Sequence, residues 1–437
     1  MERIRYLDLL RPLAISCVVY GHWLIIGLTY SGGRFSDLNV LDYIQWGRWV
    51  TWAFQVMPVF FLAGGYVNAL SWTAHHAQGE RWNWWVQRRA MRLWWPTAVY
   101  VAVGSVSVAQ ANVAKTAPAE IALAGRLVTL QLWFLPVYLV LIALTPVMFA
   151  AHRRWGLTVP AAMAAAAALV SALMAVPHLR GIGYVNYLLV WGAIHQCGFA
   201  WRDGMLTRAR WRPYALGAGG AALLAGLVTS GAFQVDMVGL GNTNPPSTAL
   251  VAYAAAQAGL VLAAAPAATR LLARPRRWHR VQRLNNAVMT VYLWHFVPVL
   301  AIAAAFYRTG VMPQPAIGTA QWWALRPAWL ALLTIVLVPL TAAIMWAERP
   351  MRRLPAGIGP ARPWSSLLLF AGLAASLSGL AQLTIGGFAP GGHLPVPALA
   401  QCAVGLAATL LSGRDPAARA KPQARSPHQP DKPPMAA

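Results

Sequence analysis

Charged residues are scarce in this chain: they make up 11% of its 437 residues, whereas 58% are hydrophobic. A soluble domain of this size needs a polar surface, so the composition excludes an ordinary soluble enzyme. The mean hydropathy is +0.50, and apolar runs recur that reach the roughly 20 residues needed to cross a bilayer. We therefore expect an all-α, polytopic membrane protein.

Cysteine is scarce as well. Cys17, Cys197 and Cys402 all fall in apolar stretches, and their spacing matches neither a metal site nor the pairing pattern of an extracellular protein. We expect buried free thiols, no metal and no permanently bound cofactor. A cleavable signal is not expected either, because the first apolar run follows only MERIRY and lacks a small-residue cleavage site.

Twelve apolar stretches predict membrane spans, at 8–28, 49–70, 93–112, 127–150, 157–177, 184–201, 213–232, 248–268, 287–306, 327–347, 364–384 and 394–412. Ten of these stretches fall within residues 1–353, which we expect to form a transmembrane domain. Residues 354–412 would add one or two C-terminal transmembrane helices. Residues 413–437 are rich in Pro, Ala and basic residues, which predicts a disordered tail.

The formal net charge of +24 would suggest a nucleic-acid partner in a soluble protein. Here most Lys and Arg fall in alternate connections, on the side of the N-terminus. Because cytoplasmic loops collect Lys and Arg, we expect both termini in the cytoplasm and the chain in the cell (plasma or inner) membrane. The charge thus reflects topology, the lipid bilayer is the expected partner, and nucleic acid is not.

The first span holds Asp8, Arg11 and His22. Titratable side chains at membrane depth are costly and normally face a protein interior or a wet cavity on a functional path. At 3.6 residues per turn, Arg11 and His22 lie on one face of the helix, about 16 Å apart along its axis. Asp8 shares that stripe but lies about 21 Å from His22, so the two cannot touch.

His22 is the leading candidate for chemistry, because an unperturbed imidazole with a pKa of about 6.5 exchanges protons at neutral pH. A hydrogen bond to a neighbouring helix is the structural alternative. Arg89 and Arg92 lie three residues apart before the third span, where two guanidinium groups on one helix face can grip phosphates. Taken alone, the arginine pair is better explained by anchoring on the cytoplasmic side of the membrane, where Lys and Arg collect.

Other polar residues near or within spans have simpler explanations. His295, in VYLWHFVPV, can make a polar contact between helices, and His195 is expected to be structural. Glu348 lies beside Arg349 and one turn before Arg352, so a local ion pair accounts for it. Upstream of the arginine pair, the glycines of FLAGGYV allow helices to approach closely or to bend.

Six motifs, in this order, resemble the integral-membrane acyltransferase 3 family. They are YLDLLRPLAISCVVYGH, MPVFFLAGGYV, the RxxR of Arg89 and Arg92, LWFLPVYL around Trp133, VYLWHFVPV and ERPMRR. The resemblance extends over about residues 5–353 and implies a core of about ten helices that takes an acyl group from cytoplasmic acyl-CoA. The acceptor would be a hydroxyl, occasionally an amine, on a sugar, lipid, antibiotic or surface polymer.

The resemblance also implies residue roles. His22 and Arg11 would be catalytic, and Arg89 and Arg92 would bind the acyl-CoA co-substrate, with acetyl-CoA favoured. Substrate-binding or supporting roles would fall to Asp8, Trp133, His295 and Glu348. The chain departs from some relatives in lacking an SGNH hydrolase-like domain, and its last two spans lie beyond the common core.

We therefore expect an acyl-CoA-dependent membrane acyltransferase with His22 as general base. Transfer could be direct or could pass through an acyl-histidine intermediate. A polytopic transporter is the first alternative, although no repeat between the two halves is visible, which many carriers show. A lipid-binding scaffold without turnover is the second alternative, for which the basic loops would suffice.

Overall fold

The computed structural model describes residues 5–239, 241–351, 354–360 and 362–413. The expected tail 413–437 lies outside the described residues except for Gly413. The helices are α1 (Arg5–Ile25), α2 (Val40–Tyr43), α3 (Gly47–Phe54), α4 (Met57–His76), α5 (Trp82–Val113), α6 (Pro118–Leu127), α7 (Phe134–Trp155), α8 (Thr158–Leu173), α9 (Asn186–Arg202), α10 (Arg212–Thr229), α11 (Thr248–Leu271), α12 (Pro275–Trp294), α13 (Phe296–Phe306), α14 (Ala320–Ala347), α15 (Ser365–Gly386) and α16 (Val396–Leu411).

The all-α polytopic membrane fold is confirmed. Each predicted span falls mainly on one helix or on two consecutive helices. Among the described residues, five helices are long and apolar enough to cross a membrane by length and composition alone. The bent pair of α12 and α13, with 51° between them, is a sixth candidate. The three free cysteines are confirmed, of which Cys402 is buried and the other two are partly buried.

One element was not expected. The first predicted span stops at Ile25, and its last residues begin an antiparallel hairpin of β1 (Ile26–Ser31) and β2 (Arg34–Asn39). The two-residue turn uses Gly32 and Gly33, whose φ values are 56° and 78°. Positive φ at both positions is what a tight hairpin turn requires, so the Gly-Gly pair fits this role.

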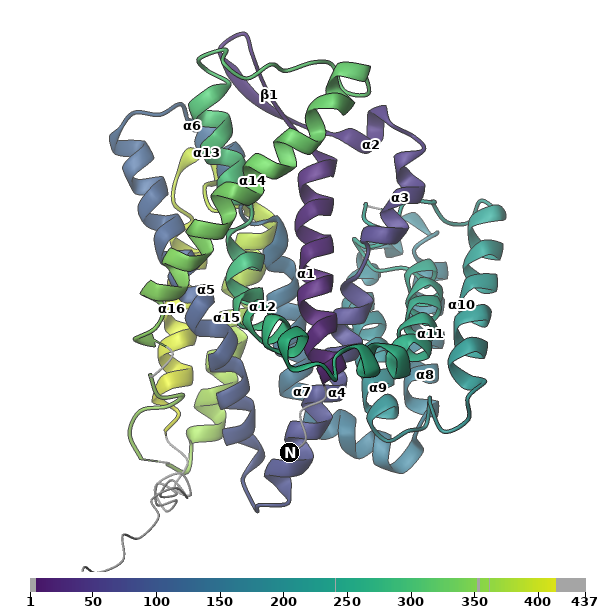
Figure 1. Cartoon of the computed structure of the whole chain (residues 1–437). Helices are drawn as coiled ribbons and strands as arrows, with labels where there is room; N and C mark the ends of the chain where they lie inside the picture. The colour runs from purple at the N-terminus through teal and green to yellow at the C-terminus, as the bar shows by residue number, and fades with distance from the viewer. Residues whose placement is uncertain (1–4, 240, 352–353, 361, 414–437) are drawn as a thin grey trace, which may run out of the picture.

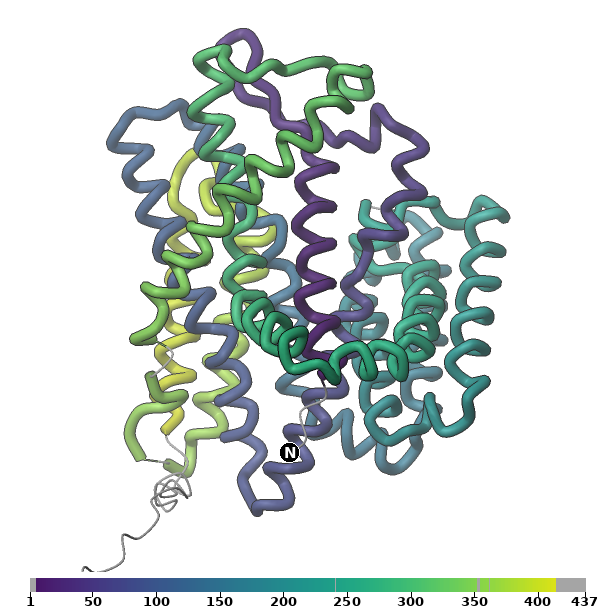
Figure 2. Tube along the Cα trace, in the orientation of Figure 1, coloured from purple at the N-terminus to yellow at the C-terminus, as the bar shows by residue number. Residues whose placement is uncertain are grey.

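The helix α1 runs through the middle of the molecule (Figure 1), where it contacts α4 and α12. Its N-terminal end lies on the same side as the α4–α5, α7–α8 and α9–α10 connections. Arg81, Arg208 and, in the last turn of α7, Arg153 belong to this side, which we call the arginine-rich side. The hairpin lies on the opposite side. The chain passes from α11 across the N-terminal part of α1 into α12 (Figure 2).

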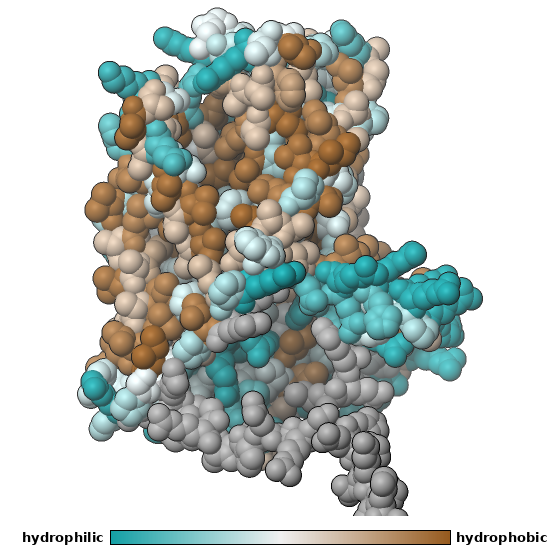
Figure 3. Space-filling view, turned by 60° about the vertical axis from the view of Figure 1, so that its left-hand side comes forward, coloured by the Kyte–Doolittle hydropathy of each residue, from teal (hydrophilic) through white to brown (hydrophobic). Residues whose placement is uncertain are grey.

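The surface fits a bilayer environment. Figure 3 shows a broad hydrophobic belt between hydrophilic residues at the two ends of the molecule. The first half of α12 is basic, and Arg276, Arg277 and Arg280 are exposed. Arginines at such a boundary can keep their charge in water while their stems cover apolar surface.

Two glycines of α4 position the helices around the candidate site. A Cβ atom on Gly65 would lie 2.0 Å from the carbonyl oxygen of His195 in α9, and one on Gly64 would lie 2.8 Å from the Tyr138 hydroxyl of α7. Any side chain there would force the helices apart. The expected close approach at the Gly-Gly pair is therefore confirmed, and it brings polar groups of α4 and α9 together.

Candidate active site

His22 and His295 meet inside the helix bundle. Nδ1 of His22, on α1, lies 2.9 Å from Nε2 of His295. His295 occupies the bend between α12 and α13. Pro298 follows three residues later. A proline has no N–H to donate to the carbonyl four residues before it, and its ring clashes with that carbonyl, so it breaks or kinks a helix there. The break at residue 294 therefore follows from the sequence, and it turns the His295 ring toward α1.

Hydrogen bonding determines which nitrogens carry protons in this pair. Nδ1 of His295 lies 2.8 Å from the carbonyl oxygen of Tyr292, and a carbonyl can only accept, so this nitrogen donates. In neutral His295 the other nitrogen, Nε2, must then accept. His22 therefore donates from Nδ1, which leaves its Nε2 with a free lone pair. A histidine in this tautomer is ready to accept a proton or to attack an acyl group.

The surroundings hold the pair rigidly. The indole of Trp23 donates to the backbone carbonyl of His295 at 2.9 Å. Phe296 stacks on the His22 ring at 5.4 Å between centroids. His295 is fully buried, whereas His22 is partly accessible. His22 is thus the member that a substrate can reach, and His295 supports it from behind.

Arg89 forms a second polar chain that links three helices. Its guanidinium donates to Oδ1 of Asn68 on α4, so the amide nitrogen of Asn68 faces Nε2 of His195 on α9 at 3.0 Å. Asn68 and His195 are fully buried. The contacts of Asn68 and His195 were not predicted from the sequence, although each of the two is a polar side chain inside an apolar helix. His195 stays structural, as expected, but what it supports is Arg89.

The arginines singled out from the sequence lie near one another. Arg92 and Arg11 are close enough to Arg89 for their like charges to repel it. Arg11 is half-buried, one turn beyond Asp8, which is buried and accepts from the amide of Asn285 at 3.4 Å. Three positive charges in one partly desolvated region attract a multiply charged anion.

A cavity of about 460 Å³ opens beside this cluster, between α5, α12 and the end of α14. Its lining includes Arg88, Arg92, Thr290 and Glu348. Arg88 also pairs with Glu80. Oε2 of Glu348 accepts from the hydroxyl of Thr290 at 3.4 Å, so Glu348 contacts α12; Arg352, its other expected neighbour, lies outside the described residues.

Trp133 belongs to a different region. It lies at the start of α7 and packs on Tyr187 and Trp191 of α9, with ring centroids 6.2 Å and 5.5 Å away. These contacts stabilise the packing of α7 on α9. Another cavity, of about 510 Å³, is also separate: α5, α6 and α13 form most of it, its wall is almost wholly apolar, and Glu120 and Arg308 pair in its lining.

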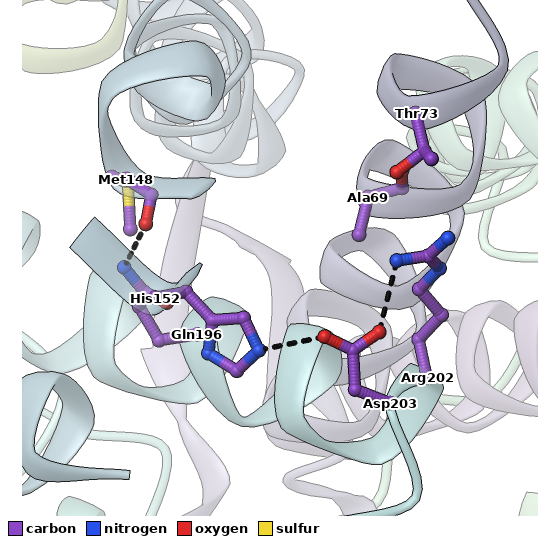
Figure 4. A network of polar contacts seen from close by, with 7 residues as sticks. All are labelled: Ala69, Thr73, Met148, His152, Gln196, Arg202 and Asp203. Carbon is purple, nitrogen blue, oxygen red and sulfur yellow. Dashed lines mark hydrogen bonds and ion pairs between the residues drawn. The ribbon is translucent and has the colours of Figure 1, made fainter. Parts of the chain in front are cut away.

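Figure 4 shows another polar network, which the sequence did not predict. Nε2 of His152, on α7, lies 3.1 Å from Oδ2 of Asp203, and Arg202 donates to the other carboxylate oxygen at 2.9 Å. Gln196 donates to the carbonyl of Met148 at 2.9 Å. This network ties α7 to the end of α9. The described residues hold no group of three or more His, Cys, Asp or Glu suited to a metal ion.

Comparison with known proteins agrees with the motifs. The model of the acyltransferase 3 family, described as an acyltransferase domain, matches residues 4–346. The match spans the chain from α1 to the end of α14, and so contains both histidines and all three arginines. Searches of the curated proteins and of the solved structures found no match.

Proposed function

Because the chain belongs to the integral-membrane acyltransferase 3 family, we propose that it moves an acyl group from acyl-CoA to a hydroxyl. The acceptor class is a glycan, lipid, antibiotic or surface polymer. One observation carries the proposal: the hydrogen bond from His22 Nδ1 to His295 Nε2 leaves Nε2 of the partly buried His22 without a proton and free to act as a base. General bases of this kind typically accelerate a reaction by about 10²- to 10⁴-fold.

In the proposed reaction, His22 Nε2 takes the proton of the acceptor hydroxyl while the oxygen of that hydroxyl attacks the thioester carbonyl. The C–S bond then breaks, and the leaving thiolate takes the proton back from His22. The imidazolium formed in between keeps its Nδ1–H bond to His295, whose second nitrogen is held by Tyr292. His295 is thus a positioning residue that keeps the correct His22 nitrogen free.

The arginine cluster supports a polyphosphate donor. Acyl-CoA carries several negative charges, and binding it would relieve the repulsion between Arg89, Arg92 and Arg11. Arg89 is preorganised by Asn68, and guanidinium groups bind phosphates with strong charge-assisted hydrogen bonds. In this proposal the protein lies in the cell membrane, and its arginine-rich side faces the cytoplasm. Acyl-CoA then enters from the cytoplasm, and its thioester reaches inward past Arg11.

A covalent route uses the same atoms. His22 Nε2 would attack the thioester directly and release CoA, and the acceptor hydroxyl would then take the acyl group from the acyl-histidine. Initial-rate kinetics separate the two routes, because a covalent intermediate gives ping-pong patterns. Direct transfer requires donor and acceptor to be bound together.

The test uses membranes that contain the wild-type protein, supplied with carbon-13-labelled acetyl-CoA and analysed by mass spectrometry of membrane and secreted products. We expect a labelled ester that depends on the protein and disappears in His22→Ala at equal insertion. Loss of free thiol release in the same variant would accompany it. CoA-independent flux of a solute into proteoliposomes, without any labelled product, would instead support a transporter.

A further inference from the structure

The C-terminal extension, which we define as residues 354–360 and 362–413, lies beyond the part of the chain that the family model matches. It contains α15 and α16, which pack against each other and against α5 (Figure 1). Helix α5 carries Arg88, Arg89 and Arg92. The extension thus contacts the helix that supplies the arginine pair of the proposed donor site.

Gln87 ties the extension to these arginines. It is 2% exposed and directly precedes Arg88 and Arg89 on α5. Its side-chain amide donates to the carbonyl oxygen of Thr409, in the last turn of α16, at 2.9 Å and to the hydroxyl of Ser412, just after that helix, at 2.8 Å. Because a buried donor without an acceptor is costly, these bonds hold the arginine-bearing turn of α5 against the end of α16.

Two further contacts hold α5 before and after Gln87. One turn earlier, the buried Asn83 donates to the hydroxyl of Ser366, at the start of α15, at 3.1 Å. Farther along α5, Tyr100 packs on Phe388, which lies between α15 and α16, with 5.8 Å between ring centroids. The extension therefore fixes α5 over several turns, including the one that carries the arginines.

The extension also forms part of the wall of the cavity of about 460 Å³ beside the arginines. Leu354 and Ala356 line this cavity together with Arg92. In the same segment, the backbone amide of Ile358 donates to the carbonyl oxygen of Leu410, in α16, at 2.7 Å. The end of α16 thus holds both a turn of α5 and a segment that contributes to the cavity wall.

We propose that the C-terminal extension is part of the donor site and that Gln87 is the positioning residue through which it aligns the arginines. This inference rests on the proposed acyltransferase function and deepens it. Gln87 does not line the cavity, so it acts on the donor through the arginines that follow it. Because hydrogen bonds between guanidinium groups and phosphates depend on geometry, a shift of α5 would weaken donor binding and leave the histidine pair unchanged.

The experiment measures KM and kcat for acetyl-CoA, per inserted protein, in membranes containing wild type, Gln87→Ala, Ser412→Ala or the double variant. A lost hydrogen bond of this kind corresponds to a factor of about five, so KM should rise about fivefold in Gln87→Ala while kcat stays within about twofold of wild type. Ser412→Ala removes one acceptor and should raise KM less. Because the two side chains share one interaction, the double variant should raise KM no further than Gln87→Ala does.

Gln382→Ala is the matched control. This glutamine of α15 is exposed, and its amide donates to the side chain of Gln401 in α16 at 2.8 Å. It therefore connects the two helices of the extension to each other and not to α5. KM for acetyl-CoA should stay at the wild-type value in Gln382→Ala.

An unchanged KM in Gln87→Ala and Ser412→Ala would overturn the proposal, and so would a loss of kcat at constant KM. An equal rise of KM in Gln382→Ala would overturn it as well, because contact with α5 would then not be needed. If Gln87→Ala fails to insert, the KM of Ser412→Ala decides alone. In each case the acyltransferase function would stand, because His22-dependent turnover is measured in the same membranes. The proposed function itself fails only if wild type releases no CoA in a His22-dependent manner.

Discussion

Two histidines within the helix bundle, His152 and His22, have partners of different chemistry. His152 faces the carboxylate of Asp203, whose other oxygen accepts from Arg202 (Figure 4). His22 faces a second histidine, His295, whose other ring nitrogen donates to the backbone carbonyl of Tyr292. The first arrangement compensates charge and ties two helices together. The second fixes protons by hydrogen bonding alone and leaves one ring nitrogen open, which is what a base needs.

Burial alone therefore does not identify a catalytic histidine in this protein. His152 and His295 are both almost fully buried, and His195 is buried with an amide partner. The distinguishing feature of His22 is partial accessibility combined with a donor role at Nδ1. The following substitutions test whether this difference separates chemistry from structure.

The largest effect is expected for His22→Ala, because it removes the proposed general base. Turnover of acetyl-CoA should fall by about 10²- to 10⁴-fold, measured as free thiol release per inserted protein. Insertion is checked by fluorescence of a C-terminal fusion. His22→Ala activity within a factor of two of wild type would remove His22 from the mechanism.

The second largest effect is expected at Arg89, where we propose that the phosphates of the acyl-CoA donor bind. Arg89→Ala should raise KM for acetyl-CoA by about 10- to 100-fold, since a charge-assisted hydrogen bond contributes about 1.5–3 kcal/mol. Asn68→Ala should raise KM less, because Arg89 keeps its charge and loses only its positioning partner. Titration of initial rates with acetyl-CoA distinguishes the two. An unchanged KM in Arg89→Ala would place the phosphates elsewhere.

A smaller effect is expected at His295. His295→Phe removes the acceptor for His22 Nδ1 and should lower kcat by about tenfold, because a hydrogen bond of this kind contributes about 1 kcal/mol. His295→Gln offers an amide oxygen and should recover part of the loss. The two variants are compared by their kcat at a saturating concentration of acetyl-CoA. Equal loss in both variants, with KM unchanged, would show that the acceptor atom is not what matters.

The smallest effect on activity is expected at His152. His152→Asn should leave kcat within about twofold of wild type, because the network lies away from the histidine pair. It should lower thermal stability, since breaking a buried hydrogen bond costs about 1–3 kcal/mol; the melting temperature of detergent-solubilised protein checks this. A loss of activity as large as that of His22→Ala would erase the distinction between the two histidines.

The helices of the predicted spans could be predicted because each span is an apolar stretch close to the length needed to cross a bilayer. The shared face of Arg11 and His22 also followed from helical periodicity. The hairpin of β1 and β2 was missed because its first residues continue the apolar run of α1. Only the Gly-Gly pair signals the turn.

The pairing of His22 with His295 could not be derived from the sequence, since 273 residues separate them. It depends on how α12 crosses α1 and on the bend before Pro298, which are tertiary features. The same holds for Arg89, Asn68 and His195, which come from three helices. Motifs identified the residues, and packing decided which of them touch.

The most direct test of the central claim is nitrogen-15 NMR of the protein in lipid bilayers, with labelled histidine, comparing wild type with His22→Gln. We predict that the signals lost in the variant include a protonated Nδ1 and an unprotonated Nε2, the tautomer imposed by His295. Signals of a His22 protonated at Nε2, or at both nitrogens near neutral pH, would contradict the assignment of His22 as an open base.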